Sequence, residues 1–357
     1  MKEKSNKYFV KKVKPIEVHN GKKISQLLSD MAETGFQGKK LGQAVDVWEN
    51  MHKDPDVTVL MGYAGSLSTT GQWKIINWFI ENRYIDILVP TGANISEDTV
   101  DAMGYGYWQG SHNVNDHDLL DNDINRYYDV FGSEIDYVKM IELIAEGIMT
   151  LKDEHLYTTR EFLYEIGRFL SKKGIKSIVA TAAENKVPIY CPAIVDSPYG
   201  DAALVAKTKG FHLILDSVKD FSEFMGLAQK IKSTGVVYIG GGVPKDFIQL
   251  LAVTSPLQFE SRSVPGKKGG IHRTTNEAYY PHKYAIQITT DAPQWGGLSG
   301  CTFEEASSWG KEIFGGNNVQ CYSDATIALP LVSHALAERV KVKRKAPDFS
   351  WLFDGKK

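Results

Sequence analysis

A segment near residue 300 combines a carboxylate, an indole and a lysine at spacings that suit amine chemistry. Thr302 can cap a helix, and Glu305 stands at the capping-box position. On that helix Glu305 and Trp309 are i, i+4 neighbours on one face. A carboxylate beside an indole can hold an ammonium group through charge pairing and cation–π contact. By spacing alone, a solvated glutamate beside a core tryptophan is the favoured interpretation, and Lys311 alone would be an ordinary surface lysine.

Three consecutive glycines follow an apolar run and suit a bound phosphate. Residues 236–239 are typical of a buried strand, and Gly240, Gly241 and Gly242 come directly after them. Glycines let a backbone approach a ligand closely, and a helix that begins behind them suits a dinucleotide pyrophosphate. Triple glycine also occurs in plain turns, so this motif alone leaves both interpretations open.

Small and polar residues follow three more apolar runs, at residues 61–69, 91–98 and 324–326. Small residues at strand ends leave room for a cofactor, and a carboxylate such as Asp324 can accept ribose hydroxyls. Each cluster by itself fits a turn with a helix cap, for example Ser96 and Glu97 at the start of a helix. Four such clusters together favour a cofactor-binding edge.

The elements that position these residues alternate along the chain. Apolar runs predict strands at residues 57–62, 85–89, 213–215, 236–239, 284–288 and 319–322, and helical patterns cover residues 24–31, 41–48, 73–80, 221–231 and 304–314. This alternation predicts a doubly wound α/β fold with a mainly parallel sheet, helices on both faces and ligands at the carboxyl ends of the strands. We expect an N-terminal helical segment (1–55), a catalytic domain (56–340) and a basic tail (341–357), with irregular stretches at 103–125 and 253–281.

Composition restricts the classes of partner. The 357 residues include 41 Lys+Arg and 43 Asp+Glu, a balance that gives no electrostatic reason to expect nucleic acid or an acidic membrane. No stretch reaches the roughly 18 apolar residues of a membrane span. The three cysteines are widely spaced and form neither a disulfide framework nor a CxxC zinc pair. We therefore expect a reduced, cytoplasmic protein without a metal site.

The string Ser308-Trp309-Gly310-Lys311 resembles the active-site lysine motif of deoxyhypusine synthases. Further segments resemble that family in the same order along the chain, namely residues 34–37, 91–98, 196–201, 240–242 and 322–325. The resemblance, which extends from about Thr34 to about Glu338, implies a Rossmann-like fold and a homotetramer with active sites at dimer interfaces. It also implies a reaction in which NAD takes a hydride from spermidine, 1,3-diaminopropane leaves, and a four-carbon imine passes through the lysine to an acceptor amine.

The resemblance assigns roles to individual residues. Lys311 would carry the imine, and Glu97 would accept a proton during hydride transfer. The residues implied in NAD binding are Gly65, Ser66, Thr69, Thr91, Gly92, Ala93, Glu97, Asp196, Gly241, Gly242, Thr290, Asp324 and Ala325. Those implied in binding the polyamine are Ser96, Asp201, Asp246, Leu298, Ser299, Glu305 and Trp309. The imine chemistry also requires that Lys311 lose its proton near neutral pH.

Three positions depart from the family pattern around the amine. Asp246 stands where the synthases carry a histidine, Leu250 where they carry an asparagine, and Leu298 where they carry an amine-binding aspartate. The lysine and NAD segments are kept while the amine pocket differs, which favours a small acceptor such as putrescine and therefore homospermidine synthesis. Deoxyhypusine synthesis on a lysine of a translation factor is the alternative, and agmatine is a further possible donor.

Other function classes remain as alternatives. A sirtuin-like deacylase would need two CxxC zinc pairs, which this sequence lacks. A plain dehydrogenase would not need Lys311, so full activity without that lysine would favour it. A protein that binds NAD or polyamines without transferase activity would give neither NADH nor product.

Overall fold

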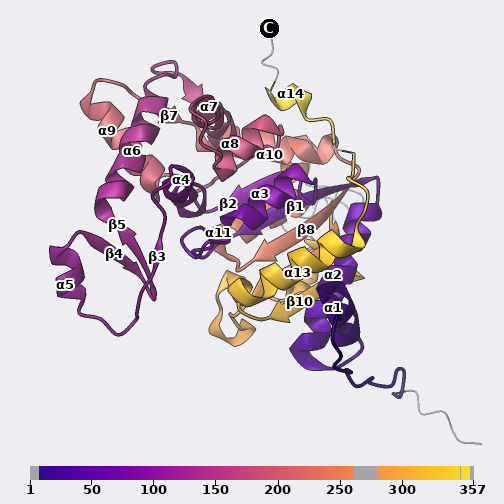
Figure 1. The fold of residues 1–357 in the computed structure, drawn as a ribbon. Helices are drawn as coiled ribbons and strands as arrows, with labels where there is room; N and C mark the ends of the chain where they lie inside the picture. The colour runs from indigo at the N-terminus through magenta and orange to yellow at the C-terminus, as the bar shows by residue number, and fades with distance from the viewer. Residues whose placement is uncertain (1–7, 260–279, 346, 354–357) are drawn as a thin grey trace, which may run out of the picture.

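The computed structural model describes residues 8–259, 280–345 and 347–353. Its centre is a sheet of five parallel strands in the order β10-β9-β8-β1-β2 (Figure 1). The strands are β1 (Val57–Tyr63), β2 (Ile87–Pro90), β8 (Ser233–Ile239), β9 (His282–Thr289) and β10 (Glu312–Tyr322). All seven residues of β1 are buried, as expected where helices cover both faces of a parallel sheet.

Helices cover the two faces of this sheet around separate hydrophobic clusters. One face carries α1 (Ile24–Ala32), α2 (Phe36–Lys53), α3 (Trp73–Glu81) and α13 (Ala325–Arg339), and the other carries α10 (Ser217–Gly226), α11 (Gly242–Phe259) and α12 (Phe303–Ser308). The alternating side chains of β1 explain this arrangement, because Val59 and Met61 pack into the first cluster and Leu60 into the second. The doubly wound, mainly parallel α/β fold predicted from the sequence is confirmed.

A lobe beyond β2 holds the remaining elements (Figure 1). Its helices are α4 (Glu97–Ala102), α5 (Asp116–Asp121), α6 (Glu134–Ile148), α7 (Thr159–Lys172), α8 (Ile178–Glu184) and α9 (Pro198–Thr208). Its strands are β3 (Trp108–Gln109), β4 (Ile124–Tyr127) and β5 (Val130–Ser133), which form an antiparallel sheet, and the parallel pair β6 (Leu156–Tyr157) and β7 (Ile214–Leu215).

Three local predictions were wrong. Residues 213–215 do not join the central sheet, because β7 pairs with β6 instead. The helix expected over 304–314 ends at Ser308, because Gly310 adopts φ 84° and turns the chain into β10. The stretch 103–125 is not irregular throughout, since β3, α5 and the start of β4 lie in it. Of the second stretch, 253–281, α11 covers the part up to Phe259, and residues 260–279 lie outside the described chain. The domain boundaries after residues 55 and 340 stay predictions.

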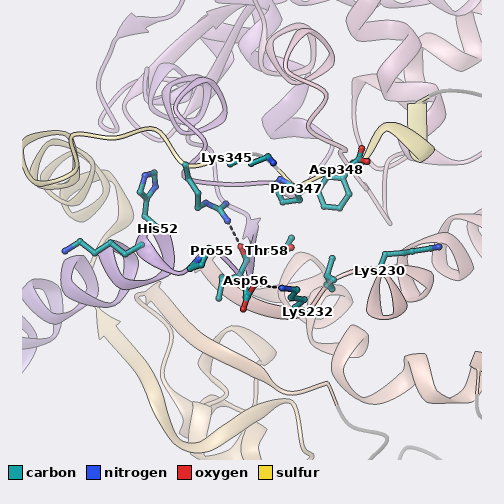
Figure 2. A pocket seen from close by; sticks show the side chains of 14 residues that line it. His52, Pro55, Asp56, Thr58, Lys230, Lys232, Lys345, Pro347 and Asp348 are labelled. Carbon is teal, nitrogen blue, oxygen red and sulfur yellow. Dashed lines mark hydrogen bonds and ion pairs between the residues drawn. The ribbon is translucent and has the colours of Figure 1, made fainter.

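The C-terminal segment runs over the amino ends of β1 and β8 and borders a hollow of about 420 Å³ (Figure 2). Arg344 anchors this segment by pairing with the buried carboxylate of Asp86, and Lys232 pairs with Asp56 at 2.7 Å in the wall of the hollow. Ligands of open α/β sheets bind at the carboxyl ends of strands, so this hollow is not where the cofactor is expected. Residues 341–345 and 347–353 are therefore partly integrated into the fold, and α14 (Ser350–Phe353) ends the described part of this segment.

Among the described residues, none of the helices combines the length and the hydropathy needed to cross a membrane.

Candidate active site

A cavity of about 470 Å³ opens at the carboxyl ends of β1, β8, β9 and β10. Seven of the predicted cofactor residues line it, namely Gly65, Ser66, Gly241, Gly242, Thr290, Asp324 and Ala325. Asp324 also caps α13, where its Oδ1 accepts the backbone N–H of Thr326 at 2.7 Å. The strand-end clusters at 61–69, 240–242 and 324–326 therefore meet at one edge of the sheet, as the alternation predicted.

The triple glycine forms the floor of this cavity for a steric reason. Gly240 and Gly242 have φ values of 69° and 65°, a backbone conformation that favours glycine. A Cβ on Gly241 would lie 2.4 Å from the Cα of Ser299, so the two backbones approach closely only because no side chain stands between them. This cradle is of the kind that a pyrophosphate needs.

Replacing Gly241 by alanine is therefore expected to displace the 298–300 segment and to weaken NAD binding by at least about tenfold, roughly 1.4 kcal/mol. Binding measured by calorimetry on the purified protein tests this, with Gly226→Ala as the control, because a Cβ there meets no atom within 4 Å. Equal affinity of Gly241→Ala and the unaltered protein would contradict the cradle.

The other predicted cofactor residues lie outside the lining of this cavity. Thr69 is buried and its hydroxyl bonds with Ser66. Thr91 accepts a hydrogen bond from Asn94 Nδ2 at 2.9 Å, and Gly92 and Ala93 follow it at the start of the 3-10 helix Ala93–Ile95. Asp196 is exposed on the loop before α9.

Lys311 lies where α12 ends and β10 begins, and only 8% of its surface is exposed. Its Nζ donates to Asp246 Oδ1 at 3.1 Å and to Gln249 Oε1 at 3.3 Å. The same nitrogen is 5.7 Å from the ring centroid of Trp309, whose side chain is 56% exposed. Glu305, whose N–H donates to the capping oxygen of Thr302 at 3.1 Å, is exposed nearby on α12. The surface-lysine interpretation of Lys311 is therefore wrong, and the core-tryptophan interpretation of Trp309 is wrong as well.

A second lysine, Lys245, is fully buried beneath the 298–301 segment. Its Nζ donates to Gln287 Oε1 at 3.0 Å and to the carbonyl oxygens of Leu298 and Cys301 at 3.2 and 2.7 Å. Burial lowers the pKa of Lys245. These bonds fix the 3-10 helix Leu298–Gly300, and Ser299 there donates to Asp291 Oδ2 at 2.6 Å. Lys245 thus fixes the ends of the segment 298–301, and Ser299 of this segment lines the cavity.

Glu97 lies in a different place, at the start of α4 beyond β2. Burial raises the pKa of its carboxyl group to about 7, while a hydrogen bond from Tyr127 acts in the opposite direction. Burial raises the pKa of the Tyr137 phenol, and the nearby carboxylates of Glu97 and Asp201 raise it further. Ser96 is fully buried. Its hydroxyl donates to the carbonyl oxygen of Gly92 at 2.9 Å and is therefore turned toward Gly92.

One chain therefore carries two separate groups of predicted site residues. Lys311 precedes β10 at one edge of the sheet, while Glu97 follows β2 at the other edge. Four inter-strand steps separate these edges, which is roughly 19 Å at the usual strand spacing. The structure brings Asp246 and Trp309 to Lys311, with Glu305 on the helix α12 that precedes it, and places Glu97 with Asp201, Tyr127 and Tyr137.

No group of three or more histidine, cysteine or carboxylate side chains suited to a metal ion occurs in the part of the chain that the structure describes.

A model of the deoxyhypusine synthase family matches residues 26–336. The chain belongs to the deoxyhypusine synthase family. Enzymes of this family transfer aminobutyl groups with the help of NAD, and the chain is a transferase of this kind. The match covers the segment containing Lys311, the triple glycine and the Glu97 region, so the resemblance stated from the sequence is confirmed.

Relatives in this family extend over nearly the whole chain. A "Probable deoxyhypusine synthase 2" of Methanosarcina mazei is 43% identical over 340 residues, which are 94% of this chain and 93% of that protein. A protein of the same description from Archaeoglobus fulgidus is 44% identical over 330 residues, or 90% and 100% of the two chains. A "Deoxyhypusine synthase-like protein" of Chlorobaculum tepidum is 34% identical, with 96% and 93% covered.

A solved structure of similar fold is the "putative deoxyhypusine synthase" of Entamoeba histolytica, with a TM-score of 0.61 and 16% identity over 93% of this chain and 100% of that one. This likeness supports the fold that the deoxyhypusine synthase family implies.

Sequence reasoning missed several residues of this deoxyhypusine synthase family site. Lys245 and Gln249 are i, i+4 neighbours on a helix whose other residues are mostly apolar, so two polar residues on one face were a signal that these positions are special. Asp291 and Glu312 carried no such signal, because Ser299 lies across a loop from Asp291 and Gln249 is 63 positions from Glu312.

Proposed function

We propose that this protein moves the aminobutyl part of spermidine through Lys311 to an acceptor lysine of a protein, as in deoxyhypusine synthesis. The observation that carries the proposal is the burial of Lys311 with its Nζ between Asp246 and Gln249. A lysine that forms an imine must be sheltered from water and held in one position. Lys311 meets both conditions.

The cavity at the carboxyl ends of the strands fits NAD. Its glycine floor accepts a pyrophosphate, and the carboxylate of Asp324 can accept ribose hydroxyls. When bound, NAD supplies the hydride acceptor for the carbon beside the secondary amine of spermidine. Ser299 of the segment Leu298–Gly300 lines this cavity, and the bonds from Lys245 to the carbonyl oxygens of Leu298 and Cys301 hold the segment in place.

The carboxylates around the two groups suit a polyamine with several ammonium ends. Asp246 and Glu305 lie on the side of Lys311, and Asp201 and Glu97 on the other side. A carboxyl group with a pKa near 7, such as Glu97, suits a proton acceptor at neutral pH. Because roughly 19 Å separates the edges of one chain, the Glu97 group of one copy would complete the Lys311 group of another. We therefore propose a homo-oligomer, a tetramer by family resemblance, with active sites between copies.

The acceptor distinguishes two functions. The descriptions of the relatives support the protein lysine over putrescine, the acceptor first expected from the sequence. Homospermidine synthesis stays as the second candidate, because Asp246 bonds directly to Lys311 and Leu298 offers no carboxylate, so this amine pocket differs from the family pattern. Leu250 does not bear on the choice, since it packs against the core cluster under α11.

Incubation with NAD and spermidine labelled in its butyl carbons tests the proposal. Parallel reactions contain a translation initiation factor with a modifiable lysine, putrescine, or no acceptor, and products are read by mass spectrometry. Label on the factor would establish deoxyhypusine synthesis, and labelled homospermidine would establish the second candidate. Absence of 1,3-diaminopropane in all three would reject spermidine as donor, and agmatine would then be tested in its place.

A further inference from the structure

The amine of Lys311 rests against a chain of two buried polar side chains. Gln249 Oε1 accepts from Lys311 Nζ at 3.3 Å, and the other end of the same amide, Nε2, donates to Glu312 Oε1 at 2.9 Å. Gln249 is fully buried and Glu312 is 2% exposed. Among the described residues, Gln249 is the sole hydrogen-bond partner of the Glu312 side chain, whose Oε2 has none.

This arrangement fixes which end of the amide faces Lys311. An amide side chain has an acceptor end and a donor end, which can exchange places by rotation. An ionised carboxylate accepts hydrogen bonds only, so Glu312 takes the NH₂ end of Gln249 and turns the oxygen toward Lys311. Burial raises the pKa of Glu312 to about 7, and the hydrogen bond from Gln249 and the charges of Lys245 and Lys311 oppose that rise. Well above pH 7 the carboxylate form prevails.

The orientation of the amide matters for the reactivity of Lys311. A neutral amine has two N–H bonds and one lone pair, and only the lone pair attacks an imine carbon. Asp246 and Gln249 offer one acceptor each, so together they engage both N–H bonds and leave the lone pair unoccupied. With the amide reversed, its N–H would donate into that lone pair and block attack.

We propose that Glu312 and Gln249 form a positioning pair that keeps the lone pair of neutral Lys311 free for attack on the oxidised polyamine. This inference rests on the proposed function. In the step concerned, the Lys311 nitrogen bonds to the iminium carbon that hydride removal leaves, one proton passes from that nitrogen to the departing nitrogen, and the old C–N bond breaks, which releases 1,3-diaminopropane and leaves a protonated imine on Lys311. If attack by Lys311 is slow, water attacks the same carbon instead and the four-carbon unit is lost as 4-aminobutanal.

The test compares Glu312→Gln, Gln249→Leu and the double variant at a pH well above 7. Glu312→Gln keeps the shape but can pair with either end of the amide, so it removes the fixed orientation together with a negative charge near Lys311, whereas Gln249→Leu keeps that charge. We expect each single variant to lower the ratio of transferred to hydrolysed four-carbon unit by about 10- to 100-fold, with the KM for spermidine unchanged. If Glu312 acts through Gln249 alone, the double variant is no worse than Gln249→Leu.

Thr159→Val is the matched control, because it removes another buried hydrogen bond, from the Thr159 hydroxyl to Asp220 Oδ2 at 2.7 Å, in the lobe beyond β2 and away from Lys311. An equal loss in this control, additive effects of the two single variants, or an unchanged ratio in Glu312→Gln would overturn the proposal. Thermal melting of each variant shows whether it folds.

A second readout does not depend on the proposed function. Butanal and cyanoborohydride alkylate a reactive amine, since the aldehyde condenses with loss of water and the reagent reduces the resulting imine. The label on the Lys311 peptide is measured by mass spectrometry. We expect about tenfold less label in both single variants than in the unaltered protein. If the unaltered protein releases no 1,3-diaminopropane, the proposed function is wrong. The labelling still tests the positioning pair in that case. Less label in the single variants supports the pair, and equal label in variants and unaltered protein overturns it.

Discussion

Lys311→Arg is expected to abolish transfer of the four-carbon unit, with a loss on the order of 10³-fold or more in product. A guanidinium stays protonated and forms no imine, while its charge preserves the pairing with Asp246 that Lys311 makes at 3.1 Å. Borohydride added during turnover should trap a labelled adduct on Lys311 in the unaltered protein and none in the variant. Mass spectrometry of the peptide and of the acceptor checks both statements.

NAD affinity serves as the control for this variant, since Lys311 does not line the cavity at the carboxyl ends of the strands. Unchanged NAD binding together with lost transfer places the defect in the imine step. Full transfer by Lys311→Arg would instead reject the lysine imine, and NADH formation without any transfer in the unaltered protein would favour a plain dehydrogenase.

Glu97→Gln is expected to slow oxidation of spermidine by about 10²- to 10⁴-fold, the range for loss of a general base. The amide keeps the size of the side chain in a site where Glu97 is 6% exposed, but it cannot accept a proton. Because burial raises the pKa of the Glu97 carboxyl to about 7, the rate for the unaltered protein should rise with pH through about 7. Stopped-flow absorbance of NADH over a pH series measures this rise, which should be absent in Glu97→Gln.

Loss of rate without loss of that pH dependence would assign the ionisation to another group, such as Asp98, whose pKa burial also raises to about 7.

The stability of the fold gives an independent check. An acid whose pKa rises from 4.5 unfolded to about 7 folded binds its proton more tightly in the folded state. Its contribution is therefore favourable below pH 4.5 and is lost as the pH rises through about 7, by roughly 3 kcal/mol. Glu97→Gln should flatten that part of the stability profile.

The amino-acid sequence by itself determined the order of layers and the main motifs. Apolar runs such as residues 57–62 and 236–239 alternate with helical patterns, and buried parallel strands require such runs. The triple glycine after β8 could also be recognised from the sequence. Gly240 and Gly242 have positive φ values, which favour glycine, so this backbone conformation appears as glycines at consecutive positions. The family was recognisable because its motifs are short strings of neighbouring residues, such as the one that ends in Lys311.

What surrounds those motifs was decided by the tertiary structure. Gln249 and Glu312 are 63 positions apart, and Lys245 donates to carbonyl groups more than 50 positions away. Local sequence patterns therefore cannot predict these contacts. Sheet order also places Lys311 and Glu97 at opposite edges, although the strands before and after them look alike in the sequence. Local periodicity reports which residues are buried, whereas hydrogen-bond partners and the order of strands depend on how distant segments pack.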